Sequence, residues 1–313
     1  MVSERILRAA QTIEARSVER FAAQCAARST RLWLANEPDF PIRDAEFHEG
    51  MPLVLLGEGE RPDAFAAPRV AIVGTRAATP IGLDDSYELA ATLARAGITI
   101  ISGLAIGIDA AAHEGALAAG GLTVGVVATG LDVVYPRRHT TLFARVRKHG
   151  VIVGEHDFGV HPLAWRFPIR NRIIAALADA VVVVEATQKG GARITADCAG
   201  DYNRKLYAVP GSRRNPAAAG CNELIANCAI PLLDPSDILI GLGLRTKDQT
   251  RRTTEIKDAD QRKLMRAFAG HGATTRELQE RTGFAPARLG RALRGLAGAR
   301  LIEQKRGMWW PNP

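Results

Sequence analysis

The sequence has few cysteines and no long apolar segment. Its 313 residues include only 4 cysteines, and no two of them form a C-x-x-C pair. We therefore expect buried free thiols rather than a disulfide scaffold or a zinc cluster. Charged or polar residues interrupt every apolar run before the roughly 18 residues that a membrane span needs. The N-terminal stretch carries charges where a signal peptide would be apolar. We expect a cytoplasmic protein without membrane contact.

Several motifs that mark nucleotide-dependent and hydrolytic enzymes are absent as well. The sequence has no G-x-x-x-x-G-K-[ST] P-loop, no G-x-S-x-G elbow and no H-E-x-x-H pair. A dinucleotide site would need G-x-G-x-x-G after its first strand and an acidic residue at the end of its second. The sequence has G-T-R-A-A at residues 74–78 and Ser102-Gly103 at the second position. We expect neither a cofactor nor a bound metal ion.

The net charge of +8 is not spread evenly along the chain. From Arg245 onward there are 16 Lys and Arg against 7 Asp and Glu, whereas the residues before it have 25 against 26. A basic C-terminal segment is typical of a module that meets a polyanion. A solvated tail that aids solubility is the alternative.

The chain is organised around residues 69–76 (R-V-A-I-V-G-T-R). Four apolar residues predict a strand buried on both faces, and Gly74 permits a sharp turn. Thr79 and Pro80 then suit the cap and first position of a helix. The succession repeats, with strands expected at residues 98–101, 123–127, 151–154, 180–185 and 206–209. This alternation predicts an α/β fold with a doubly wound parallel sheet, whose ligand crevice lies at the carboxyl ends of the strands.

Arginines accompany the turns and loops at that edge, and their planar guanidinium groups suit phosphate. They are Arg76, Arg137, Arg138, Arg170 and Arg172. Arg76 could instead pair with Asp84 or Asp85, and Arg172 could belong to a structural ion pair. His113 is expected to be a core histidine and Asp109 a helix cap.

Several segments together resemble the DprA/Smf family of DNA-processing proteins. They are residues 70–76, 102–113 (S-G-L-A-I-G-I-D-A-A-A-H), 130–136 (G-L-D-V-V-Y-P), 167–174 (F-P-I-R-N-R-I-I), 207–211 (Y-A-V-P-G) and 220–225 (G-C-N-E-L-I). The resemblance implies an extended Rossmann-like domain that binds single-stranded DNA without cleaving it. It also implies a homodimer that protects incoming DNA and loads the RecA recombinase during natural transformation or recombination.

The resemblance further implies which residues contact DNA. They are Gly74, Thr75, Arg76, Ser102, Gly103, Arg137, Arg170, Asn171, Arg172, Gly190 and Gly191. Three positions depart from the family's usual pattern. Gly190-Gly191-Ala192 stands in place of S-G-S and keeps only the backbone turn, His139 replaces an asparagine, and Cys228 replaces a glycine.

The C-terminal segment has a pattern of its own. We expect an N-terminal helical segment at residues 1–37, the Rossmann-like domain at 38–240, a linker at 241–260, and a winged helix-turn-helix at 261–313. The third helix and the wing present Arg288, Arg291, Arg294, Lys305 and Arg306, which would contact DNA. An ordinary solvated helix face, or a contact with protein, would give the same pattern.

The sequence thus favours a non-enzymatic, single-stranded DNA-binding homodimer with RecA as its partner. Two alternatives belong to other classes. A nucleotide-binding Rossmann enzyme or sensor resembling phosphoribohydrolases would use the turn at residues 189–195, but Cys198 stands where that family has a glutamate. A transcriptional regulator would use the winged module on duplex DNA.

Overall fold

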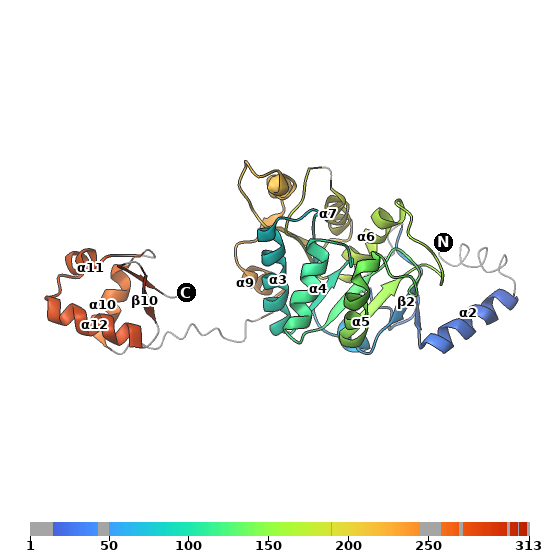
Figure 1. The fold of residues 1–313 in the computed structure, drawn as a ribbon, viewed down its shortest axis with the longest axis horizontal. Coiled ribbons are helices and arrows are strands. Elements are labelled where there is room, and N and C mark those ends of the chain that lie inside the picture. Colours follow the sequence, from blue (N-terminus) through green and yellow to red (C-terminus); the bar gives the residue numbers. More distant parts are fainter. Residues whose placement is uncertain are drawn as a thin grey trace. The chain divides into compact units, whose positions relative to one another are not determined.

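The computed structural model describes residues 15–42, 50–188, 190–244, 258–268, 272–298, 301–305 and 307–311. The chain divides into two compact units, Met1–Leu244 and Arg245–Pro313 (Figure 1). Most of the expected linker, residues 245–257, lies outside the described residues. Within the described residues, no helix is both long and apolar enough to cross a membrane.

The first unit is built on one nine-stranded sheet with the order β1-β2-β6-β5-β4-β3-β7-β8-β9. The seven strands β6-β5-β4-β3-β7-β8-β9 are parallel to one another. At one edge β2 is antiparallel to both β6 and β1. The strands are β1 (Arg31–Leu34), β2 (Val54–Glu58), β3 (Arg69–Val73), β4 (Thr99–Ser102), β5 (Thr123–Val126), β6 (Gly150–Gly154), β7 (Ala180–Val183), β8 (Lys205–Ala208) and β9 (Ile230–Pro231). This mostly parallel sheet confirms the predicted Rossmann-like α/β fold.

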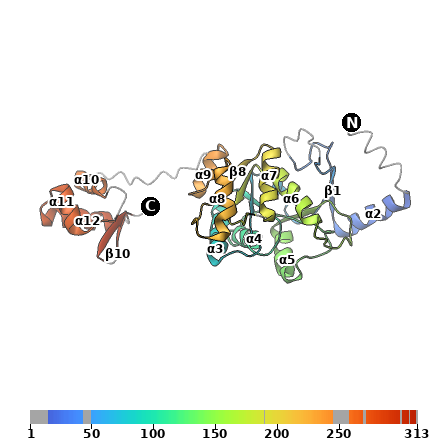
Figure 2. The ribbon, with the colours of Figure 1, turned by 90° about the horizontal axis from the view of Figure 1, so that it is seen from above.

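Helices cover both faces of the sheet, as Figure 2 shows. One face carries α3 (Pro80–Arg95), α4 (Ile108–Ala118) and α5 (Thr140–His149), and the other carries α6 (Arg166–Leu177), α7 (Gly191–Asp201) and α8 (Ala219–Ala226). Successive side chains of β3 alternate between the two cores, so Val70 and Ile72 face α3 whereas Ala71 and Val73 face α6. Ile238 of α9 (Pro235–Gly241) joins the core on the α3 side.

The N-terminal segment differs from the prediction. Residues 1–14 lie outside the described residues, α2 spans Ala15–Arg28, and after a two-residue turn residues 31–34 form β1 rather than continuing a helix. Trp33 explains the strand, because it is 3% exposed, packs edge-on against Phe65, and lies over Gly57 of β2. A Cβ atom on Gly57 would lie 2.4 Å from the Trp33 ring. The pairing partner, rather than local propensity, therefore determines this strand.

The second unit has three helices followed by a hairpin. They are α10 (Ala259–Ala267), α11 (Thr275–Thr282), α12 (Pro286–Gly298), β10 (Ile302–Lys305) and β11 (Met308–Pro311). Thr274 and Glu277 form a capping box at the start of α11, and Gly283 ends the helix with φ of +67°. One side of α12 supplies Leu289, Leu293 and other apolar residues to the core of this unit.

All four cysteines are free. Only Cys221 is buried, and burial raises the pKa of its thiol to about 12. Cys228 is exposed, and Cys25 and Cys198 are half-buried, so the prediction that the free thiols are buried is wrong for these three.

Candidate nucleic-acid interface

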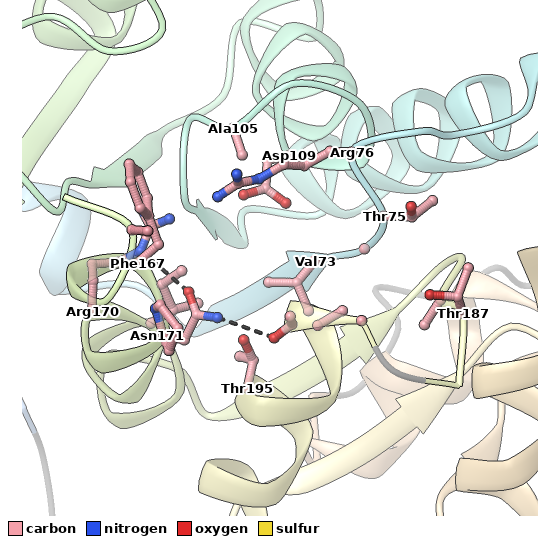
Figure 3. A pocket seen from close by; sticks show the side chains of 18 of the residues that line it. Val73, Thr75, Arg76, Ala105, Asp109, Phe167, Arg170, Asn171, Thr187 and Thr195 are labelled. Carbon is pink, nitrogen blue, oxygen red and sulfur yellow. Dashed lines mark hydrogen bonds between the residues drawn. The ribbon is translucent and has the colours of Figure 1, made fainter. Parts of the chain in front are cut away.

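A pocket of about 580 Å³ opens at the carboxyl ends of β3 and β7. In the sheet, β3 has the next strand in sequence, β4, on one side and β7 on the other. The direction in which successive strands are added to the sheet therefore reverses at this point. This switch point is where open α/β sheets bind their ligands. The turn after β3, the first half of α6 and the start of α7 form the walls, as Figure 3 shows.

Arg76 lies at the mouth of this pocket. Its side chain is exposed, and its guanidinium carbon lies 5.0 Å from the centroid of the Phe167 ring. The Phe167 ring in turn lies 5.3 Å from that of Tyr135, which is 42% exposed. Within the described part of the chain Arg76 forms no ion pair, so the alternative pairing with Asp84 or Asp85 is not present. A cation and two aromatic rings are therefore available to a ligand.

The turn that carries Arg76 is fixed from below by the end of β7. The Thr75 N–H donates to the backbone oxygen of Glu185 at 2.7 Å, and the Glu185 carboxylate accepts from the N–H and hydroxyl of Thr79 at 2.9 and 2.6 Å. A Cβ atom on Gly74 would lie 2.5 Å from the side chain of Ile108. Glycine is needed here because α4 packs so closely against the turn.

Arg170 does not lie on the pocket surface as a free cation. It is 3% exposed, and its guanidinium donates to the backbone oxygens of Gly103, at 2.7 Å, and of Val126. Burial lowers the pKa of Arg170 to about 10, so it remains charged at neutral pH. The expectation that Arg170 contacts phosphate is corrected, because its donors hold the ends of β4 and β5 in place.

Asp109 is the buried counterpart of Arg170. Its carboxylate accepts the Gly103 N–H at 3.1 Å, and burial raises its pKa whereas the charge of Arg170 opposes that rise. The prediction that Asp109 caps a helix is wrong, because Gly107 caps α4 and Asp109 lies inside its first turn.

Ser102 and Gly103 are also corrected as phosphate contacts. The Ser102 side chain is fully buried, and its hydroxyl donates to the backbone oxygen of Ile72 at 2.6 Å. The Gly103 N–H and carbonyl are bonded to Asp109 and Arg170. Both residues therefore hold the floor of the site and have no free donor for a ligand.

The other two residues of the F-P-x-R-N-R segment have separate roles. Arg172 pairs with Glu155, with 2.5 Å between Nη2 and Oε2, so the alternative of a structural ion pair is present. The phosphate contact of Arg172 stays a prediction. Asn171 lines the pocket; its amide nitrogen donates to the Gly191 oxygen at 3.1 Å, and its oxygen accepts from Arg170. Asn171 thus ties α6 to the first turn of α7 (Figure 3).

Gly190 and Gly191 form the start of α7 and line the pocket as expected. Gly190 is the cap residue, and a Cβ atom on Gly191 would meet nothing within 4 Å. The first turn of a helix has backbone N–H groups without a helical partner, which favours an anionic group nearby. The two glycines contribute no side chain to this wall of the pocket.

Arg137 and Arg138 lie on a short 3-10 helix, Arg137–His139, and both are exposed. Neither forms an ion pair with a described residue. The His139 ring nitrogen Nδ1 lies 3.0 Å from the Leu104 oxygen and holds this segment against the turn after β4. Tyr135 and Pro136, which precede it, line a small hollow together with Arg76. The predicted site residue Arg137 is therefore close to the pocket in the fold.

Sequence reasoning missed two further arginines at the same edge. Arg213 and Arg214 follow β8, are both exposed, and form no ion pair with a described residue. The signal was present, because the strand predicted at residues 206–209 ends shortly before the two arginines.

His113 lies in the core, as expected. It is fully buried, and its Nδ1 lies 2.7 Å from the Thr123 hydroxyl oxygen. Burial lowers its pKa to about 3, so the ring is neutral at physiological pH. Among the described residues no group of His, Cys, Asp and Glu has the arrangement of a metal site.

The basic residues of the second unit differ in their surroundings. Arg288 forms two hydrogen bonds of 2.6 Å with Asp260 and lies 4.7 Å from the Phe284 ring centroid, so it is already engaged. Arg291 and Arg294 are exposed and have no ion-pair partner among the described residues. Lys305 ends β10, but its side chain and Arg306 lie outside what the structure describes.

Comparisons with known proteins agree on one family. The family described as DNA recombination-mediator protein A matches residues 31–243. A DprA relative from Mycobacterium tuberculosis (strain H37Rv) is 40% identical over 265 residues, covering 82% of this chain and 68% of the relative. The DNA processing protein DprA of Bacillus subtilis is 37% identical over 199 residues, covering 64% of this chain and 67% of the relative.

Solved structures show the same relationship. The X-ray structure of DprA from Streptococcus pneumoniae has a TM-score of 0.65 and 32% identity, covering 75% of this chain and 80% of that chain. DprA from Helicobacter pylori, described with a single-stranded DNA binding mode, has a TM-score of 0.59 and 28% identity over 68% of this chain and 95% of that chain. The protein described here therefore belongs to the DprA/Smf family of DNA-processing proteins.

Proposed function

We propose that this protein binds single-stranded DNA in the crevice at the carboxyl ends of β3 and β7. The observation that carries the proposal is Arg76, which is exposed, has no ion-pair partner among the described residues, and lies over Phe167 at the pocket mouth. Single strands are bound by cationic grooves in which aromatic rings stack with unpaired bases. Paired bases in a duplex could not reach such a ring. The H. pylori relative, whose structure is described with single-stranded DNA, supports this choice of ligand.

The pocket favours binding over catalysis. Asp109 is the one carboxylate among the described lining residues, and no histidine or cysteine lines the pocket beside it. Its carboxylate accepts the Gly103 N–H and faces Arg170, so it lacks the free partner that acid–base or nucleophilic chemistry would require. A non-enzymatic role follows, in preference to a phosphoribohydrolase-like reaction.

The biological role is proposed at the level of the family. A protein that matches a recombination mediator would protect a single strand and deliver it to the RecA recombinase during transformation or recombination. We propose that it does so as a homodimer in the cytoplasm. Coelution with RecA and single-stranded DNA, and the mass of the free protein by light scattering, test these two assertions separately.

We further propose that the second unit is a winged helix-turn-helix. Three helices and a hairpin occur in the required order, and α12 presents Arg291 and Arg294 on its exposed side. Because Arg288 is paired with Asp260, it is not proposed as a contact. Removing residues 245–313 should leave a core that binds single strands more weakly. If sequence-specific duplex binding by this unit were found instead, it would act as a transcriptional regulator.

The variant Arg76→Glu tests the main site. Binding of a single strand releases fewer counterions when the protein makes fewer phosphate contacts. We therefore expect the variant to lose most of its affinity and to show a shallower dependence of affinity on salt. Fluorescence anisotropy with a labelled 20-nucleotide thymidine oligomer across a salt series measures both. Arg95→Glu, at the end of α3 away from the crevice, is the control of equal charge. Unchanged affinity in Arg76→Glu would place the site elsewhere.

A further inference from the structure

The turn that follows β8, the neighbour of β7 in the sheet, carries two adjacent cations. Arg213 and Arg214 are both exposed, and the described residues offer neither of them a carboxylate partner. Nearby arginines are engaged, since Arg193 pairs with Glu223 and Arg172 with Glu155. The two charges of the turn are therefore left for a ligand.

The turn is held rigidly by backbone contacts. Asn222 of α8 accepts the Gly211 N–H at 3.2 Å and donates to the Gly211 oxygen at 3.0 Å. The Asn215 N–H donates to the Ser212 oxygen at 2.9 Å, and the Asn215 side chain caps the short 3-10 helix Pro216–Ala218. The backbone that presents the two arginines is thus fixed before any ligand binds, which lowers the entropic cost of binding.

The same segment is connected to the pocket wall. The Ala186 N–H donates to the Ala217 oxygen at 3.0 Å, and the Gly220 N–H donates to the Ala186 oxygen at 2.7 Å. Ala186 and Thr187 line the pocket, and Figure 3 shows Thr187 on the loop at its edge. The pocket and the turn therefore belong to one continuous edge of the sheet.

The sheet order sets the distance between the two places. The turn follows β8, and Arg76 follows β3, with β7 between them. Neighbouring strands lie about 4.8 Å apart, so these strand ends are roughly 10 Å apart. Phosphates along one strand of a duplex are spaced by about 3.4 Å along the axis. A polynucleotide can span this distance, whereas a mononucleotide in the pocket cannot also fill the turn.

We propose that the turn at residues 212–215 is a second phosphate anchor for the strand whose neighbouring nucleotide occupies the pocket. This inference rests on the proposed single-stranded DNA function and extends its track along the sheet edge from β3 to β8. The ligand it takes is a sugar-phosphate backbone of several nucleotides. Guanidinium groups suit such phosphates because they can donate two parallel hydrogen bonds.

The double variant Arg213→Glu/Arg214→Glu tests the anchor in the full-length protein. With a 20-nucleotide thymidine oligomer we expect roughly tenfold weaker binding near 0.15 M salt, and a salt slope shallower by about 1.4, since each phosphate contact on a single strand contributes about 0.7. A 5′-phosphorylated thymidine dinucleotide, titrated calorimetrically, should bind the variant and the wild type equally. Both side chains are exposed, so the thermal midpoint should not change.

The matched control is Arg95→Glu/Lys148→Glu, which makes the same charge change in the last turns of α3 and α5, before the amino ends of the following strands. The anchor is refuted if the two double variants bind the 20-nucleotide oligomer equally, or if the dinucleotide loses as much affinity as the oligomer. Arg76→Glu separates this result from the main proposal. If Arg76→Glu loses binding while the turn variant matches its control, the pocket stands as the DNA site and the second anchor does not.

Discussion

The guanidinium of Arg76 lies over the ring of Phe167, 91 positions away in sequence, with 5.0 Å between the guanidinium carbon and the ring centroid. The cation comes from the turn after β3 and the ring from the first turn of α6. A base that stacks there would lie beside a charge that can hold its own phosphate.

The ring of Phe167 should matter through stacking. We expect Phe167→Ala to weaken binding of a thymidine oligomer by about 1–3 kcal/mol, the usual contribution of one base on one ring. Phe167→Tyr should retain most of the affinity because it retains the ring. Anisotropy titrations of both variants measure the difference, and an oligomer that lacks bases should bind the wild type and Phe167→Ala alike. Equal binding of the normal oligomer to all three proteins would contradict the stacking role.

Replacing Arg170 should destabilise the first unit. Arg170→Met removes the bonds to Gly103 and Val126 and takes away the cation that most offsets the charge of the buried Asp109 carboxylate. The loss of one partner of a buried pair costs about 3–5 kcal/mol. Urea unfolding, followed by the fluorescence of buried Trp33, measures it. Arg172→Met, which breaks a partly exposed pair, is the comparison and should cost less.

His113 should make stability depend on pH. Burial lowers its pKa to about 3 in the folded protein, whereas an unfolded histidine has a pKa near 6.5. The unfolded chain therefore binds the extra proton first, and this contribution to stability is lost as pH falls from about 6.5 towards 3, by up to about 1.4 kcal/mol per pH unit. Urea unfolding at several pH values measures the slope. His113→Gln should flatten it, and an unaltered slope in that variant would assign the effect to other groups.

Two glycines that line the pocket should respond differently to alanine. In Gly74→Ala the new methyl group would lie 2.5 Å from Ile108 and 2.8 Å from the Glu185 oxygen, so the turn must shift and Arg76 with it. We expect lower stability and weaker DNA binding. Gly191→Ala meets no atom within 4 Å and replaces glycine in a helix, so stability should hold or rise slightly. Thermal unfolding and anisotropy compare the two, and a tolerant Gly74→Ala would show that the turn adapts.

The sequence predicted the sheet and the edge at which the pocket opens, because these follow from local patterns. Apolar runs that end in glycine identify parallel strands, and their carboxyl ends must share one edge. The strand β1 escaped this reasoning, because four residues carry little periodicity and only pairing with β2 and packing on Gly57 make them extended.

Which arginines form contacts within the fold could not be predicted in the same way. Arg170 and Arg172 lie two positions apart on α6, yet one is buried against the ends of β4 and β5 and the other pairs with Glu155. Their partners come from distant parts of the chain, so spacing alone gives no sign of which guanidinium stays free. Arg76 forms no ion pair with a described carboxylate, although its charge opposes the rise in the pKa of the nearby buried Asp109.

The two hydrogen bonds between Asn222 and Gly211 fix the backbone of the turn after β8 independently of the side chains that would bind a ligand. The glycine takes part in these hydrogen bonds through its main-chain N–H and oxygen, so the loop can fold with other side chains at the next positions. Arg213 and Arg214 can therefore be exchanged for other side chains without disturbing the crevice beside them. Natural variation at these two positions could adjust how tightly a relative holds its strand while the architecture stays constant.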